Sequence, residues 1–196
     1  MYMTGVGSWK KRTFDLGLSL VLLPPAVVVC GVAAAVIAID DRANPLFIQE
    51  RLGRNGRRFR LVKLRTMRIG TGDRPSHETS TASITRMGTF LRRTKLDELP
   101  QLWNVLIGDM SFVGPRPGLP TQTLLDAQRQ QYGVHKLLPG ITGVGQVAGL
   151  DMSQPDLLAQ YDALYLVPWS IKRDMHLLLQ TALGGGRGDA ANRQNI

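Results

Sequence analysis

The stretch that decides the fold runs from Arg92 to Pro117 and reads R-R-T-K-L-D-E-L-P-Q-L-W-N-V-L-I-G-D-M-S-F-V-G-P-R-P. Its apolar side chains recur at steps of three and four residues, which predicts a helix with one buried face. The residues of that face are Leu96, Leu99, Leu102, Trp103 and Leu106. Because proline lacks a backbone N–H, Pro100 is tolerated only in the first turn, so the helix should begin near Leu96 or Asp97.

Two adjacent carboxylates, Asp97 and Glu98, stand at the expected start of this helix. The helix dipole stabilises anions there, and phosphate groups bind well at the same place. One interpretation is purely structural, because Thr94-x-x-Asp97 fits a capping box. The other is catalytic: an anionic nucleophile and a metal-binding oxygen lie beside several phosphate-binding cations. The nearby cations are Arg92, Arg93, Lys95 and Arg116.

The charge of the chain points to an anionic partner. The 196 residues, normally one domain, carry 24 Lys and Arg against 15 Asp and Glu, a formal net charge of +9. Nucleic acid, an anionic membrane surface and phosphorylated substrates all fit that charge. The single cysteine, Cys30, excludes a disulfide framework and a zinc cluster. Magnesium remains available, since it needs only carboxylates, phosphates and water.

The N-terminal region indicates a membrane anchor. In residues 1–15, Trp9 stands beside Lys10, Lys11 and Arg12, a combination typical of the cytoplasmic headgroup layer. Residues 16–39 then contain no charged side chain, and 24 apolar residues are long enough to cross a bilayer as a helix. A spanning anchor, a cleaved signal peptide and a re-entrant hairpin are the three interpretations.

A re-entrant hairpin fits the flanks of this segment best. The segment continues past the small-residue site at Ala33–Ala35, which argues against a signal peptide. Pro24 and Pro25 remove two backbone donors in mid-run and predict a bend. Both flanks are basic, and basic flanks prefer the cytoplasm, so a hairpin satisfies both whereas a spanning helix violates one.

Several shorter patterns complete the fold. Residues 45–68 predict a β-hairpin, with an Asn-Gly turn between two apolar runs. Residues 70–83 predict a polar surface loop, and Phe90 and Leu91 after it are expected in the core. Residues 118–133 predict a helix facing water through Gln128–Gln131. The glycine-rich segment 138–150 lacks P-loop spacing. The fold class is therefore α+β and mainly helical.

The stretch L-D-E-L-P-Q-L-W-N-V-L-I-G-D-M-S-F-V-G-P-R-P resembles the bacterial sugar transferase family, the small monotopic phosphoglycosyl transferases that act on polyprenyl phosphate. K-L-R-T-M at 63–67 resembles the family's Lys-x-Arg-Ser/Thr-Met segment, which implies substrate contacts for Lys63 and Arg65. The resemblance covers roughly residues 10–183. At 138–150 the chain departs from the family pattern, which leaves its sugar open. The departing residues are Val144, Ala148 and Leu150.

The resemblance implies transfer of a sugar 1-phosphate from a nucleotide diphosphate sugar, with UDP expected, to polyprenyl phosphate. It also implies Asp97 as nucleophile, Glu98 and Asp97 as Mg²⁺ ligands, and phosphate binding by Arg92 and Arg116. The secondary candidates are Asp109 in the same stretch, and Asp162 and Asp174, which match the family's C-terminal pattern. The product would feed downstream glycosyltransferases, and no nucleic acid partner is expected.

The expected organisation has four parts. Residues 1–15 form a basic juxtamembrane segment and residues 16–39 a re-entrant helix broken at its prolines. Residues 40–183 form the catalytic domain on the cytoplasmic leaflet of a bacterial inner membrane, and residues 184–196 a flexible tail. The alternative is a membrane-tethered basic module that binds anionic lipid or nucleic acid without catalysis, through the arginines between Arg42 and Arg68.

Overall fold

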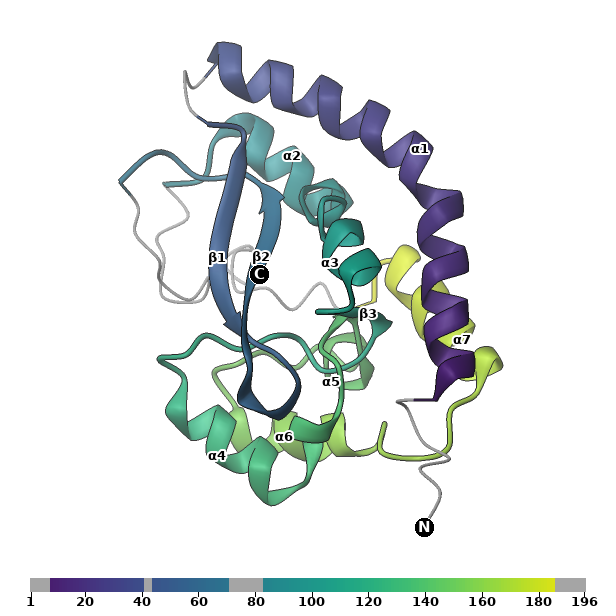
Figure 1. Ribbon diagram of the computed structural model, residues 1–196. Helices are drawn as coiled ribbons and strands as arrows, with labels where there is room; N and C mark the ends of the chain where they lie inside the picture. The colour runs from purple at the N-terminus through teal and green to yellow at the C-terminus, as the bar shows by residue number, and fades with distance from the viewer. Residues whose placement is uncertain (1–7, 41–43, 71–82, 186–196) are drawn as a thin grey trace.

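The computed structural model describes residues 8–40, 44–70 and 83–185, and within these ranges the chain is mainly helical (Figure 1). Its main elements are α1 (Trp9–Asp40), β1 (Leu46–Leu52), β2 (Arg58–Leu64), α2 (Arg86–Thr94), α3 (Gln101–Ile107), β3 (Ser111–Val113), α4 (Thr123–Gln131), β4 (Gly140–Thr142), α5 (Val144–Val147), α6 (Pro155–Ala163) and α7 (Ile171–Ala182). Short 3₁₀ turns are η1 (Arg54–Gly56), η4 (Leu96–Glu98) and η5 (Val134–Lys136). The α+β, mainly helical class is confirmed. The predicted loop at 70–83 and the predicted tail lie almost wholly outside the described residues.

Helix α1 wraps around one side of the molecule and changes direction between its N-terminal and C-terminal halves (Figure 1). It is helical through Pro24 and Pro25, and its 32 residues correspond to a length of about 48 Å. It begins at Trp9, so the second half of the predicted juxtamembrane segment forms its first turns. Among the described residues it is the one helix long and apolar enough to cross a membrane.

The two ends of α1 are attached to the rest of the chain, whereas its middle is exposed. Near the N-terminal end, Lys11 and Asp15 are buried. Near the C-terminal end, Ala33 and Ile37 pack with Leu64 of β2 and Leu91 of α2. Between these ends, most apolar side chains are accessible. The exposed ones include Leu20, Val21, Val27 and Val28.

Strands β1 and β2 form the predicted antiparallel hairpin, in register from Leu46 opposite Leu64 to Leu52 opposite Arg58. The Asn-Gly turn is confirmed by positive φ angles of 58° at Asn55 and 73° at Gly56. The side chain of Asn104 on α3 accepts from the Val62 N–H and donates to the Arg60 carbonyl, which holds β2 against α3.

The glycine-rich segment contributes β4 and α5, and its glycines allow close backbone packing. Strand β4 pairs in parallel with β3, with Ser111 opposite Gly140. A Cβ atom on Gly140 would collide with the Gly114 nitrogen, and one on Gly114 would collide with the Leu138 carbonyl oxygen. Neither position can therefore carry a side chain, and the two glycines let the 114–117 segment pack closely against the 138–140 backbone.

The main core lies under α3, β3 and α7, and two of the predicted core residues lie outside it. Leu102 and Leu91 are buried as expected, but Trp103 is 59% exposed and Phe90 is 52% exposed. Helix α3 begins only at Gln101, with Pro100 as its N-cap, instead of near Leu96. The 3₁₀ turn before it changes the helical phase, so the face through Leu102 and Val105 is buried and Trp103 points outward.

Candidate active site

Asp97 and Glu98 lie in the 3₁₀ turn η4, which joins α2 to α3. Helix α2 ends because Lys95 adopts a left-handed conformation with φ 58°. The Thr94 hydroxyl donates to the Phe90 carbonyl at 2.8 Å and so acts within α2. The capping-box interpretation of Thr94 and Asp97 is therefore wrong. The two carboxylates occupy a tight corner between helices, not the first turn of one long helix.

Asp97 is buried within a group of charged side chains that come from separate segments. It is 7% exposed, and burial raises its pKa to about 6, with the neighbouring Glu98 charge adding to the rise. Three cations act in the opposite direction: Lys63 of β2, Arg92 of α2 and Arg116 of the 114–117 segment. Desolvation outweighs their attraction. Three stretches of the chain, around positions 63, 92–98 and 116, therefore bring their charges to one carboxyl group.

Lys63 belongs to the same group. Burial lowers the pKa of Lys63 to about 8, and the positive charges of Arg51, Arg92 and Arg116 lower it further against the attraction of Asp97. The Lys63 ammonium also lies 5.3 Å from the centre of the Phe47 ring, its partner across the hairpin. An incoming phosphate group would stabilise the protonated form of a lysine with a pKa lowered in this way.

Arg116 pairs with Glu98, Nη1 to Oε1 at 3.1 Å, and both side chains are largely buried. The backbone of this arginine is also held, because Arg129 of α4 donates to the Arg116 carbonyl at 2.8 Å. Arg129 in turn donates twice to Oδ2 of Asp162, at 3.1 and 2.6 Å. The prediction that Arg129 faces water is thus wrong: the side chain is buried, paired with Asp162 and supports the segment that carries Arg116.

Asp162 is connected to the site through Arg129. Burial raises the pKa of Asp162, and Arg129 counteracts that rise. On the other side of the site, Arg92 donates from Nε to the buried Thr66 hydroxyl at 2.9 Å, which orients its guanidinium near Asp97.

Other predicted residues lie apart from this group. Arg65 donates to the Asn44 carbonyl at 2.7 Å and stacks 5.7 Å from the Phe47 ring at the open end of the hairpin. It is not among the charges that shift the pKa of Asp97. Asp109 follows the end of α3, where its N–H donates to the Asn104 carbonyl. Asp174 is buried in a separate ion cluster on α7.

Arg51 is a site residue that sequence reasoning missed. It donates to the Pro117 carbonyl at 3.2 Å and to the Gln49 side chain at 2.5 Å, and its charge acts on Lys63. The signal was the two-residue period of a strand, which places positions 47, 49 and 51 on the face that carries Lys63. Nine basic residues lie between Arg42 and Arg68, so Arg51 could be assigned to the site only once the hairpin register was known.

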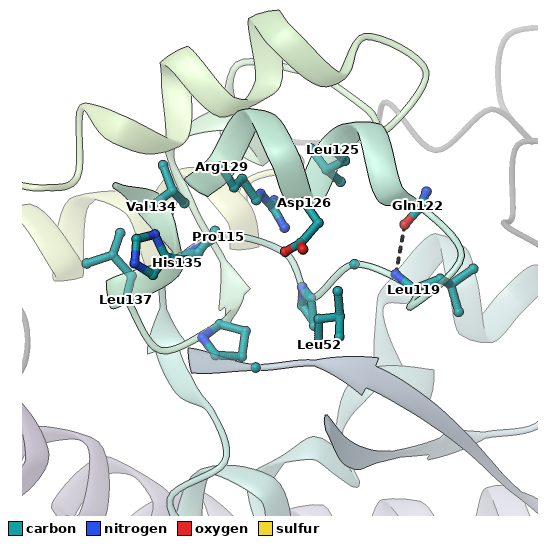
Figure 2. A pocket seen from close by; sticks show the side chains of 14 residues that line it. Leu52, Pro115, Leu119, Gln122, Leu125, Asp126, Arg129, Val134, His135 and Leu137 are labelled. Atoms are coloured by element: carbon teal, nitrogen blue, oxygen red, sulfur yellow. Dashed lines mark hydrogen bonds between the residues drawn. The ribbon is translucent and has the colours of Figure 1, made fainter. Parts of the chain in front are cut away.

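A pocket opens behind the 114–118 segment, between the hairpin turn and α4 (Figure 2). Pro115 and Pro117 line it, but Arg116 between them does not, since its side chain turns to Glu98. Neither Asp97 nor Glu98 lines it. The pocket is therefore separate from the group of charged side chains around Asp97.

Asp97 and Glu98 are suited to share a magnesium ion with a substrate. Among the described residues no three His, Cys, Asp or Glu side chains gather as a metal site. Magnesium, however, is commonly held by one or two carboxylates together with substrate phosphates and water. Two adjacent carboxylates surrounded by phosphate-binding cations meet that requirement.

A family model described as bacterial sugar transferase matches residues 6–185. The chain belongs to the bacterial sugar transferase family. This sugar transferase chain is 37% identical over 185 residues to undecaprenyl-phosphate glucose phosphotransferase of Komagataeibacter xylinus, covering 88% of the chain and 35% of the relative. It is 34% identical over 196 residues to UDP-galactose-lipid carrier transferase of Erwinia amylovora, covering 87% and 39%.

A third relative is the UDP-glucose:undecaprenyl-phosphate glucose-1-phosphate transferase of Xanthomonas campestris pv. campestris, 40% identical over 166 residues. There the match covers 77% of this sugar transferase chain and 34% of the relative. The chain thus spans less than half the length of these relatives. The resemblance predicted from the D-E stretch is confirmed at the level of the family.

Proposed function

We propose that this chain transfers a sugar 1-phosphate from a UDP-sugar to a polyprenyl phosphate such as undecaprenyl phosphate, with release of UMP. The observation that carries the proposal is the convergence of Lys63, Arg92 and Arg116 around the adjacent carboxylates of Asp97 and Glu98. A diphosphate bond needs neutralisation of its charge and a placed nucleophile to be cleaved, and this group supplies both. The names of two relatives support the same reaction, since both name undecaprenyl phosphate and one also names UDP-glucose.

In the first step the Asp97 carboxylate attacks the phosphorus atom that bears the sugar. The bond from that phosphorus to the bridging oxygen breaks, UMP leaves, and an aspartyl-phosphosugar remains on the protein. With a pKa of about 6, Asp97 is ionised at neutral pH yet stays poorly solvated, as a nucleophile should be. Arg116 and Lys63 bind the phosphate oxygens, and the Arg116 fork matches two of them.

In the second step an oxygen of the polyprenyl phosphate attacks the same phosphorus atom. The bond to Asp97 breaks, which regenerates the carboxylate and yields polyprenyl-diphosphate-sugar. Glu98 and Asp97 would hold Mg²⁺ together with the donor's diphosphate, and the ion would neutralise charge on the departing phosphate. Two successive steps let one site serve a soluble donor and a membrane-bound acceptor in turn.

The membrane arrangement we propose is re-entrant, with both ends of α1 on the cytoplasmic side of a bacterial inner membrane. Support comes from the contacts of the helix: Lys11 reaches Asp174 near one end, and Ile37 packs with Leu91 near the other. A straight spanning helix about 48 Å long would carry one end away from the domain that both ends contact. The exposed middle of α1 is then the part within the bilayer.

This topology has a direct test. After Cys30→Ala, cysteines placed by Met3→Cys and Ala190→Cys should both react with an impermeant thiol reagent only from the cytoplasmic side. Labelling of the Met3→Cys variant from outside would mean that the helix spans. Replacement of Pro24 and Pro25 by leucine should straighten α1 and reduce transfer to the lipid, with Asp97 untouched.

The reaction itself is tested by a panel of nucleotide sugars with undecaprenyl phosphate and Mg²⁺, measuring nucleoside monophosphate release. One UDP-sugar should give release that requires the lipid for multiple turnovers, and Asp97→Asn should stop it. The alternative, a basic membrane-bound binding module, predicts no release with any donor and salt-dependent binding of any polyanion.

A further inference from the structure

A buried ion cluster joins the first turns of α1 to α7. The Lys11 ammonium lies 2.6 Å from Oδ1 of Asp15 and 2.8 Å from Oδ2 of Asp174. The three side chains are 3%, 1% and 0% exposed. Figure 1 shows α7 beside the N-terminal half of α1, far along the sequence from it. Charges this deeply buried are tolerated only in a fully partnered arrangement.

Three neutral donors complete the cluster, two from the connection between α6 and α7 and one from β3. Tyr165 donates its hydroxyl to Oδ1 of Asp174 at 2.6 Å, and the Trp169 indole N–H donates to Oδ2 at 2.9 Å. The Phe112 backbone N–H on β3 donates to Oδ1 of Asp15 at 3.3 Å. One cation and two anions leave an excess negative charge, which these donors offset. Because each bond is directional, the cluster favours one orientation of α1 against the domain.

Arg12, the residue after Lys11, also attaches α1 to α3, the helix that follows the two carboxylates. Arg12 donates to the Val105 carbonyl at 2.5 Å and to the Leu106 carbonyl at 2.7 Å, at the end of α3. Helix α3 begins three residues after Glu98. The start of α1 is therefore fixed both to α7 and to the helix that follows the two carboxylates.

We infer that Lys11, Asp15 and Asp174 are positioning residues for the lipid substrate: they set the orientation of α1, and hence the height of Asp97 relative to the bilayer. The inference rests on the proposed function in taking the acceptor to be a membrane-bound phosphate. The bilayer fixes the height of that phosphate, and the exposed apolar middle of α1 fixes the height of the protein. A change in the angle between α1 and the domain then affects the lipid, whereas a soluble donor reaches the site from any height.

The test compares Lys11→Met with Lys10→Met. Lys10 is the adjacent lysine of the same helix and is exposed beside Trp9, so it controls for lost charge. In vesicles with undecaprenyl phosphate, Lys11→Met should raise the KM for the lipid about tenfold or more and leave the KM for the UDP-sugar within twofold. Lys10→Met should change neither by more than twofold. With a short-chain, water-soluble polyprenyl phosphate in detergent, the defect of Lys11→Met should largely disappear.

Equal loss toward both substrates, or an equal defect with the soluble acceptor, would mean that the cluster only supports folding and would overturn the inference. Should Lys11→Met fail to fold, Tyr165→Phe decides, because it removes one donor to Asp174 and keeps the ring. It should raise the lipid KM two- to fivefold with the donor KM unchanged, and an unchanged lipid KM would count against the inference. Absence of turnover in the wild type would instead refute the proposed function.

Discussion

Replacing Asp97 by asparagine should abolish turnover and, at the same time, stabilise the fold at alkaline pH. The carboxyl is 7% exposed, and its pKa rises from 3.8 to about 6 in the folded chain. At 1.36 kcal/mol per tenfold change, the ionised group costs about 3 kcal/mol of folding free energy above pH 6. Below about pH 3 the carboxyl is protonated in both folded and unfolded chains, so the cost vanishes. The neutral amide of the Asp97→Asn variant would avoid the cost at every pH.

The assay is thermal unfolding of the metal-free, detergent-solubilised protein at pH 8 and pH 4.5. For a chain of this size, up to about 3 kcal/mol corresponds to a rise in melting temperature of up to ~10 °C at pH 8. At pH 4.5, where the carboxyl is still largely ionised in the unfolded chain, the rise should shrink to about a third of that value. Asp109→Asn, a half-exposed carboxyl after α3, is the control and should shift the melting temperature little at either pH. Destabilisation by Asp97→Asn at pH 8 would refute the reasoning, because it would show that the surrounding cations outweigh desolvation.

Three further predictions concern activity. The kcat/KM for the donor should fall below about pH 6, because Asp97 becomes protonated there. It should also fall above about pH 8, because Lys63 loses its charge. A flat profile from about pH 5 to 9 would contradict both roles. Glu98→Gln should raise the Mg²⁺ concentration needed for half-maximal activity at least tenfold, and an unchanged metal titration would remove Glu98 from metal binding. Arg116→Ala should cost about a hundredfold or more in kcat/KM, whereas Arg57→Ala on the exposed hairpin turn should cost less than threefold; equal losses would mean that only bulk charge matters.

The sequence predicted those parts of the fold whose signals are local. The Asn-Gly pair and the alternating strands gave the hairpin with its turn, because the turn type depends on two adjacent residues. The carboxylate pair and three of the cations around it, Lys63, Arg92 and Arg116, were also found, through motifs that each occupy a short stretch. Arg65 was included with Lys63 because the two share one short motif, but its contacts are with the Asn44 carbonyl and the Phe47 ring.

What the sequence could not predict depends on contacts between distant residues. Arg129 stands among glutamines on a polar helix, and only the fold places it against Asp162, 33 residues later. Trp103 was expected inside because its spacing continues from Leu96, but the 3₁₀ turn at Asp97 resets the phase before α3 begins. From the sequence, Lys11 was interpreted as a contact with lipid headgroups, because nothing local indicates that Asp174 lies beside it.

The central claim, a covalent bond between Asp97 and the sugar phosphate, is tested most directly by mass spectrometry. The protein is incubated with its UDP-sugar and Mg²⁺ but without polyprenyl phosphate, quenched and digested. The peptide that contains Asp97 should gain the mass of the sugar phosphate, with one UMP released per protein, and the adduct should vanish when polyprenyl phosphate is added before the quench. The Asp97→Asn protein should show no adduct. UMP release only when both substrates are present, with no adduct on any peptide, would contradict the account and indicate direct transfer to the lipid.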